Sequence, residues 1–196
     1  MFKIFIIYIK IEQLKSQSFY RLIMASKYSP LSLKIFPHSV LREKASLITN
    51  FEDMDIFYKE MLNIMYHNHG IGLAANQAGL AIRAFVMDIT EDKSEPKLFI
   101  NPEVLESSAE KQTIEEGCLS LPGIAAKITR PKTILLKYID ENEKEVEQEF
   151  SGLASTCIQH EIDHLDGILF PDRVIMPKQA TLWKKYYAYI KDRSKQ

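Results

Sequence analysis

The sequence predicts an α+β protein in which mixed or antiparallel sheets surround a central helix. Strand-like and helix-like segments follow one another irregularly, no internal repeat or low-complexity linker divides the chain, and 46% of its 196 residues are hydrophobic. The irregular order argues against repeated βαβ units. The length and composition are sufficient for one domain with a buried core.

The first elements are expected to be a helix and two strands. Residues 50–70 carry apolar side chains at helical spacing, and Gly70 is expected to end this helix. The segments 82–89 and 96–105 are rich in strand-forming residues and are divided by the charged turn TEDKSEP. The apolar positions of the helix are Met54, Phe57, Tyr58, Met61, Leu62 and Met65.

The second half of the chain is expected to form a hairpin and two helices. Residues 128–150 predict the hairpin, with its turn near Glu141–Asn142. A second helix covers 153–165, opened by Gly152 and closed by Gly167. A third helix over 179–195 is expected to pack on the domain, because apolar residues recur along one face at Trp183, Tyr186, Tyr187 and Ile190.

The charge balance gives no support for a nucleic-acid or strongly acidic partner. The net charge of −1 offers no surplus that would favour DNA or another strongly charged partner.

A disulfide between Cys118 and Cys157 is one interpretation of the two cysteines. So few cysteines in a chain of this length favour a reducing compartment instead, where a thiol is a metal ligand or a core residue.

The N-terminal segment is expected to lie outside the domain. Its apolar run is broken at Lys10 and Glu12, which is too short for a membrane span. No small-residue cleavage site follows it. Residues 1–23 are therefore expected to be a dispensable extension or a misassigned start before Met24, with a docking helix or targeting segment as the alternative. Residues 24–196 are expected to form a single domain.

The stretch TCIQHEIDHLDG, residues 156–167, predicts a metal site on the second helix. His160 and His164 lie one helical turn apart on one face, with Glu161 at its edge. This spacing suits a divalent metal with a carboxylate nearby for proton transfer. The alternative is a pair of histidines satisfied by hydrogen bonds, but a buried carboxylate beside them is costly without a cation or a proton.

A catalytic metal needs a third protein ligand and one open position. Cys157 shares the helix face, but its Cα would lie about 10 Å along the axis from that of His164. It is therefore better interpreted as a core or pocket-lining residue. Cys118, in the strand-to-loop segment IEEGCLSLPG, can approach the helix from outside, and spacing alone leaves it equally open as a buried free cysteine. His67 and His69 are expected at the surface.

The small-residue run HGIGLAANQAG, residues 69–79, is a candidate for binding a peptide. Gly70 and Gly72 flank Ile71 and would let the backbone approach a ligand closely, while Gln77 supplies a neutral donor. The alternative is a helix end followed by a plain loop. A phosphate-binding loop is excluded, because no Lys-Ser/Thr pair follows.

Taken together, the chain resembles the peptide deformylase family. The segments GIGLAANQ (70–77), EGCLS (116–120) and QHEIDHLDG (159–167) are similar to the three signature segments of that family, in the same order. The resemblance extends over about residues 30–175. It implies a catalytic domain with the histidine helix at its centre. The implied reaction removes the N-formyl group from the initiator methionine of new polypeptides and releases formate.

The resemblance also implies a role for individual residues. The metal ligands would be Cys118, His160 and His164. Glu161 would be the acid and base, and Gln77 with the backbone N–H of Leu119 would stabilise the oxyanion. The substrate-binding residues would be Gly70, Ile71, Gly72, Glu116, Leu153 and Cys157. The metal would be Fe²⁺ in the cell, with Zn²⁺, Ni²⁺ or Co²⁺ as substitutes.

The expected partners, location and rival functions complete the prediction. The expected partners are N-formyl-methionyl nascent peptides, with a ribosome contact through the C-terminal helix, and the expected state is a cytoplasmic bacterial monomer that binds no membrane. An organelle is the alternative location. A general metallopeptidase that cuts internal amide bonds is one rival function. A catalytically silent homologue that only binds is the other.

Overall fold

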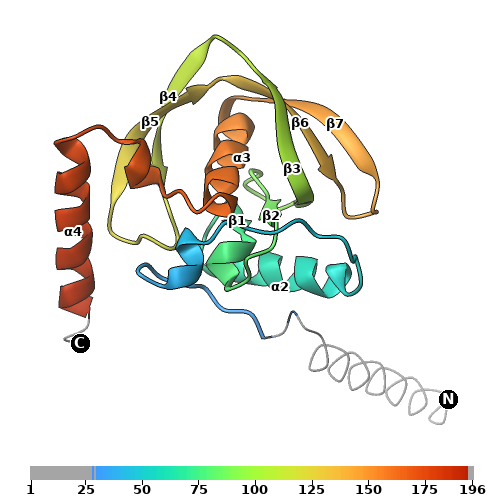
Figure 1. The fold of residues 1–196 in the computed structure, drawn as a ribbon, viewed down its shortest axis with the longest axis horizontal. Helices are drawn as coiled ribbons and strands as arrows, with labels where there is room; N and C mark the ends of the chain where they lie inside the picture. The colour runs from blue at the N-terminus through green and yellow to red at the C-terminus, as the bar shows by residue number, and fades with distance from the viewer. Residues whose placement is uncertain (1–27, 29, 194–196) are drawn as a thin grey trace.

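The structure, a computed structural model, describes residues 28 and 30–193 (Figure 1). Its main sheet is antiparallel and has the strand order β1-β2-β3-β6-β7, while β4 and β5 form a separate two-stranded sheet. The strands are β1 (Gly72–Ala74), β2 (Ala84–Met87), β3 (Lys97–Ser107), β4 (Lys111–Gly117), β5 (Ala125–Pro131), β6 (Thr133–Ile139) and β7 (Glu145–Ser151). The predicted extension, residues 1–23, lies outside the described residues.

Within the described residues, three α-helices accompany the sheets, and all three match predicted segments. They are α2 (Met54–His67), α3 (Gly152–Leu165) and α4 (Lys178–Arg193), with short 3-10 helices η1 (Ser39–Arg42), η2 (Ala75–Ala78) and η3 (Phe170–Arg173). None of the described helices has the length and hydropathy needed to cross a membrane. The α+β prediction is therefore confirmed, with antiparallel sheets.

The predicted hairpin over 128–150 is only partly right. β6 and β7 pair as expected, and Asp140 accepts backbone hydrogen bonds that close the turn around Asn142. The preceding residues, up to Pro131, instead belong to β5 and pair with β4. Proline has no N–H to donate, so it suits the point at which one strand ends and the chain passes to the other sheet.

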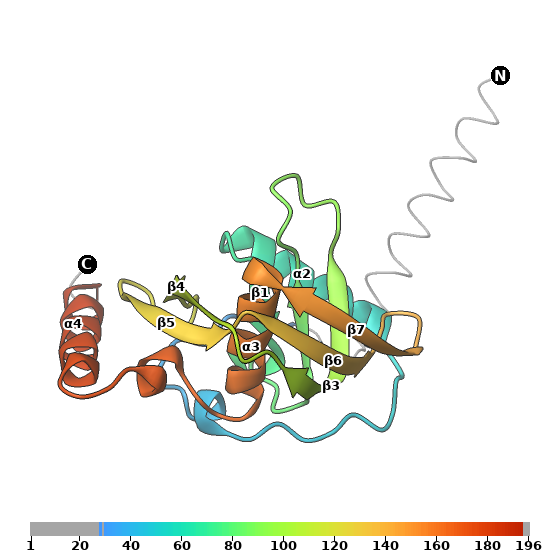
Figure 2. The same ribbon diagram turned by 90° about the horizontal axis from the view of Figure 1, so that it is seen from above.

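Helix α3 occupies the centre of the fold, between the two sheets and beside β1 (Figures 1 and 2). It packs against a cluster that includes Phe85 and Phe99, whose rings stack with centroids 4.5 Å apart, and Phe150 of β7. On the other side of β1 and β2, α2 closes a second cluster. Burial surrounds α3, so its polar side chains also point into the interior.

Helix α4 packs on the domain beside β5, as predicted. Tyr186 is fully buried, and its hydroxyl donates a hydrogen bond to the backbone carbonyl of Phe36. The centroid of the Trp183 ring lies 5.0 Å from that of the Phe36 ring. Tyr187 is 53% exposed, so the expectation that it joins the packed stripe is wrong. The contact is narrow and centres on Tyr186.

The turn after α3 sends the chain back along the helix. Gly167 has a φ of +73° there, and a Cβ at this position would lie 2.7 Å from the carbonyl oxygen of Arg42. Only glycine combines this backbone conformation with so close an approach. The turn places η3 against β5, next to the centre of the fold.

Candidate metal centre and active site

Three predicted metal ligands meet at one point. One donor atom from each of Cys118, His160 and His164 lies within 4.8 Å of the others, and the Cys118 Sγ is 3.1 Å from the His164 Nε2. The histidines share a face of α3 because they are four residues apart. Cys118 arrives from the loop that follows β4, where the Leu121 N–H donates to its carbonyl in a turn.

The donor set fits a single divalent metal. One thiolate and two imidazoles suit borderline first-row ions such as Zn²⁺ and Fe²⁺. Both cysteines are free thiols, so Cys118 is available as a ligand. Within the described ranges, no other group of three histidine, cysteine or acidic side chains has this arrangement. Burial lowers the pKa of His164 well below its usual value, which keeps this imidazole neutral and able to donate a lone pair.

His160 is held by a buried carboxylate. Its Nδ1 lies 2.8 Å from Glu116 Oε2, and Arg130 donates to both Glu116 oxygens at 2.6 and 2.9 Å. Burial would raise the pKa of Glu116, but the hydrogen bonds from Arg130 and His160 outweigh it and lower the pKa. The carboxylate is therefore ionised and accepts the Nδ1 proton, which leaves the His160 Nε2 for a metal.

The pKa of His160 itself rises well above its usual value. Burial acts to lower this pKa, but hydrogen bonds with Cys118 and Glu116 outweigh burial.

Glu116 was expected to contact substrate. It does line the cavity, but both of its carboxylate oxygens already accept hydrogen bonds from Arg130, and Oε2 also contacts His160. These contacts are those of a residue that orients His160.

A cavity of about 370 Å³ opens beside these ligands. Of the site residues expected from the sequence, only His164 does not line this cavity. The expected residues that line it are Gly70, Ile71, Gly72, Gln77, Glu116, Cys118, Leu119, Leu153, Cys157, His160 and Glu161. The sequence did not predict four further lining residues, Ile114, Glu115, Gly117 and Thr156. Two of them could have been predicted from their positions, since Thr156 precedes His160 by one helical turn and Ile114 precedes Glu116 by two strand residues. His69 is exposed as expected, but it also lies on the cavity wall.

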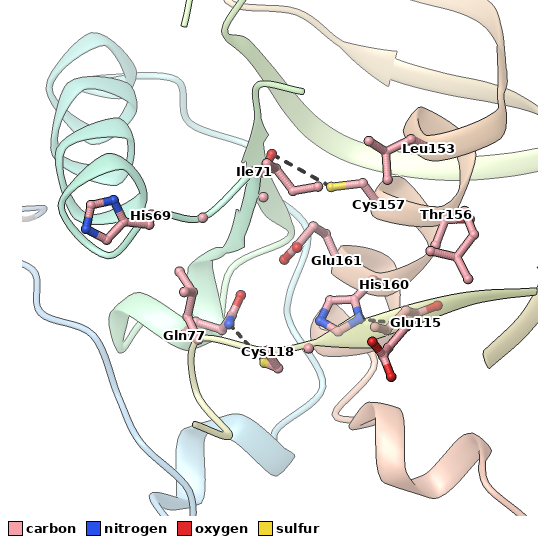
Figure 3. A pocket seen from close by; sticks show the side chains of 16 residues that line it. His69, Ile71, Gln77, Glu115, Cys118, Leu153, Thr156, Cys157, His160 and Glu161 are labelled. Carbon is pink, nitrogen blue, oxygen red and sulfur yellow. Dashed lines mark hydrogen bonds and ion pairs between the residues drawn. The ribbon is translucent and has the colours of Figure 1, made fainter. Parts of the chain in front are cut away.

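Glu161 points from α3 into this cavity, between Ile71 and Gln77 in the view of Figure 3. Its side chain is almost fully buried, and its Oε2 has no hydrogen-bond partner among the described residues. Burial raises the pKa of Glu161 to about 7. A carboxyl group with this pKa and a free oxygen is suited to exchanging protons near neutral pH.

Gln77 presents its amide nitrogen to the metal centre. Its Oε1 accepts a hydrogen bond from the Ala74 N–H at 2.9 Å, which fixes the orientation of the amide. Its Nε2 then lies 3.4 Å from Cys118 Sγ and 3.2 Å from Ser120 Oγ. The amide is therefore a preorganised donor beside Cys118.

Cys157 lines the cavity and takes no part in the metal cluster. Its Sγ lies 3.8 Å from the carbonyl oxygen of Ile71. Burial raises the pKa of the Cys157 thiol well above its usual value, so it stays protonated. This agrees with the interpretation of Cys157 as a pocket residue.

Comparisons with known proteins agree on one family of metal-dependent hydrolases. The polypeptide deformylase family model matches residues 30–180. The peptide deformylase of Brucella suis is 42% identical over 158 residues, which are 79% of this chain and 90% of the relative. That of Rhizobium meliloti is 41% identical over 82% of this chain and 94% of the relative.

Solved structures agree with these relatives. The crystal structure of a peptide deformylase from Legionella pneumophila has a TM-score of 0.79 at 33% identity, covering 85% of this chain and 98% of that one. The peptide deformylase from Thermotoga maritima has a TM-score of 0.70 at 42% identity, covering 74% and 97%.

The chain belongs to the polypeptide deformylase family. It is an enzyme of this family, a metal-dependent hydrolase that removes the N-formyl group from nascent polypeptides.

The close approach of Gly72 to Glu161 gives a testable consequence. A Cβ at Gly72 would lie 2.5 Å from Glu161 Oε1 and 2.7 Å from Cys157 Sγ. In Gly72→Ala, the carboxylate must therefore move. With Glu161 as the acid and base predicted from the sequence, a shift of about 1 Å costs on the order of 100-fold in rate. We expect turnover of a formyl-peptide to fall by about this factor. Metal content, measured on the same samples, should stay unchanged, and wild-type turnover by Gly72→Ala would contradict the assigned crowding.

Proposed function

We propose that the cavity beside Cys118 is the deformylation site, with each residue in the role that its contacts support. Cys118, His160 and His164 hold the metal, Glu161 exchanges protons, and Gln77 with the Leu119 N–H stabilises the oxyanion. The observation that carries this proposal is the gathering of the three donor atoms within 4.8 Å beside a buried carboxylate with a partnerless oxygen.

The substrate backbone is proposed to run along residues 70–72. β1 is the edge strand of the main sheet, so one side of it is not paired with another strand of that sheet. An extended peptide can add its backbone to such an edge. Gly70 and Gly72 leave room for this approach, and Ile71 follows the same path at the cavity mouth.

The methionine side chain is proposed to enter the apolar part of the cavity. Ile71 and Leu153 line this cavity and are 43% and 45% exposed, so their apolar surface is accessible to a ligand. Cys157 and Ile114 also line the cavity and add uncharged surface to it. An unbranched thioether suits a slot of this kind.

The reaction uses a proton carrier and two fixed donors. When bound, a divalent metal at Cys118, His160 and His164 would act as a Lewis acid and lower the pKa of water. Glu161 takes a proton from the attacking water, whose oxygen adds to the formyl carbon. Gln77 Nε2 and the Leu119 N–H donate hydrogen bonds to the formyl oxygen as it gains negative charge. Glu161 then returns the proton to the departing amine, and formate leaves.

The finer assignments are part of the same proposal. We propose Fe²⁺ as the metal in the cell, with Zn²⁺, Ni²⁺ or Co²⁺ able to replace it, since a thiolate with two imidazoles accommodates all four. A cytoplasmic location is supported by the formylated nascent chain as substrate and by the bacterial relatives. A monomeric state and a ribosome contact through α4 remain predictions from the family resemblance.

Selectivity for the formyl group separates deformylation from general peptide cleavage. Formyl-Met-Ala-Ser should release formate at the highest rate. Acetyl-Met-Ala-Ser should react about 100-fold more slowly, because one extra methyl group at a closed site costs about 1–3 kcal/mol. The unblocked peptide should not be cut. Turnover of each peptide is measured by chromatography, and formate release by a formate assay. Equal turnover of all three peptides would contradict the deformylase assignment for this chain.

Removal of the Glu161 carboxylate tests its assigned role. Glu161→Gln keeps the shape of the side chain but cannot take a proton, so formate release should fall by about 100- to 10,000-fold. Metal content should stay at the wild-type level. Glu149→Gln, on the exposed outer part of β7, is the matched control and should keep wild-type activity. Unchanged activity of Glu161→Gln would refute the acid and base assignment.

A further inference from the structure

The ion pairs that hold His160 continue well beyond Glu116. Arg130, which holds Glu116 through Nε and Nη2, also donates from Nη1 to Asp163 Oδ2 at 2.8 Å. Arg173 of η3 donates from Nε to the same Oδ2 at 3.1 Å and from Nη2 to Asp163 Oδ1. The contacts therefore form an unbroken chain, Arg173–Asp163–Arg130–Glu116–His160, which we call the ion-pair chain.

This ion-pair chain alternates in charge and is mostly buried. Glu116, Arg130 and Asp163 are 6%, 5% and 5% exposed, whereas the side chain of Arg173 is 47% exposed. A buried charge is stable only when a partner of opposite charge and good hydrogen-bond geometry compensates it. Two guanidinium groups face two carboxylates here, so Arg173 supplies the second positive charge that the buried pair of carboxylates requires.

The position of Arg173 depends on the turn at Gly167. α3 ends at Leu165, the chain reverses, and η3 returns against β5, which carries Arg130. The ion-pair chain thus joins four elements: η3, α3, β5 and β4. Hydrogen-bonded ion pairs therefore link η3, which follows α3, to the proposed ligand His160.

We propose that Arg173 is a positioning residue for the metal centre, which acts through Asp163, Arg130 and Glu116 to fix the orientation and tautomer of His160. This inference rests on the proposed metal ligands. Without Arg173, Asp163 keeps only Arg130 as its guanidinium partner in the ion-pair chain. Arg130 then faces two buried carboxylates alone, and its hold on Glu116 weakens. In metalloenzymes generally, removing a residue that hydrogen-bonds to a metal-bound histidine weakens the binding of the metal.

Two substitutions of Arg173 separate charge from geometry. Arg173→Gln removes the positive charge and the paired hydrogen bonds. Arg173→Lys keeps the charge but not the planar, two-pronged contact with Asp163. Because the Arg173 side chain is about half exposed, neither change opens a large cavity in the core. A loss of metal affinity in these variants would thus come from the broken ion-pair chain and not from a packing defect.

Arg83→Gln is the matched control. Arg83 Nη1 lies 2.8 Å from Asp166 Oδ1, so it also pairs with an acidic residue, three positions after Asp163 at the end of α3. Among the described residues, this ion pair shares no member with the ion-pair chain. Its loss should affect stability without reaching His160.

The experiment loads the full-length wild type, these three variants and Cys118→Ser with Co²⁺ and records two quantities. These are the visible absorption spectrum of the ion and its dissociation constant, determined by competition with a chelator. We expect the dissociation constant of Arg173→Gln to rise about tenfold, with a changed spectrum. Arg173→Lys should lie between it and wild type, and Arg83→Gln should match wild type. Thermal unfolding of the metal-free proteins reports any loss of stability separately.

The outcomes that overturn the inference are distinct from those that overturn the proposed function. A wild-type spectrum and dissociation constant in Arg173→Gln, with only a lower unfolding temperature, would show that Arg173 is merely structural. An equal change in Arg83→Gln would also show that the effect does not come from the ion-pair chain. If wild type itself lacks the thiolate-to-cobalt absorption, or keeps it in Cys118→Ser, the proposed ligands are wrong and the inference falls with them.

Discussion

Burial of the polar face of α3 is the constraint on which the rest of the structure depends. The helix lies at the centre of the fold, so His160, Glu161, Asp163 and His164 are all removed from water. Charged or strongly polar groups in such a place are destabilising unless each has a specific partner. Glu116 supplies that partner for His160, and the two arginines supply it for Asp163. The surrounding strands are arranged so that these partners reach the helix.

Two groups on the same helix, both assigned to the proposed site, keep polar atoms without a hydrogen-bond partner in the described part of the chain. His164 Nδ1 and Glu161 Oε2 are buried without a hydrogen-bond partner among the described residues. Native proteins leave few such atoms, and a catalytic role is one of the reasons for which they are kept. The cavity opens at Glu161, and Gly72 is small enough to admit its carboxylate. The energetic cost of burying Glu161 and His164 therefore falls at the proposed deformylation site.

Much of the site could be predicted because its chemistry is local in the sequence. Two histidines four residues apart with an adjacent glutamate fix the geometry of one helix face before any tertiary contact is known. The roles of Cys118 and Gln77 follow from family resemblance, since spacing alone leaves each with an alternative. The partners of the ion-pair chain could not be predicted in this way. Arg130 lies 33 residues from Asp163 in the sequence, and no periodic pattern connects them.

The fold shows the same division between local and distant information. The helices and the β6–β7 hairpin follow from periodicity and turn residues, and they appear as expected. The assignment of 128–131 to a second sheet could not be predicted, because a strand's partner depends on which neighbour the tertiary structure provides. The prediction for Tyr187 is wrong for a related reason. The narrow contact between α4 and the domain buries Tyr186 and leaves the next tyrosine exposed.

The central claim is that one thiolate from a loop and two imidazoles from a buried helix hold one metal. X-ray absorption spectroscopy of the zinc-loaded protein tests it most directly, because sulfur and nitrogen ligands lie at different distances from the zinc ion. We expect one sulfur at about 2.3 Å and two imidazole nitrogens at about 2.0–2.1 Å. A set of direct ligands without sulfur, or with a single imidazole, would contradict the claim.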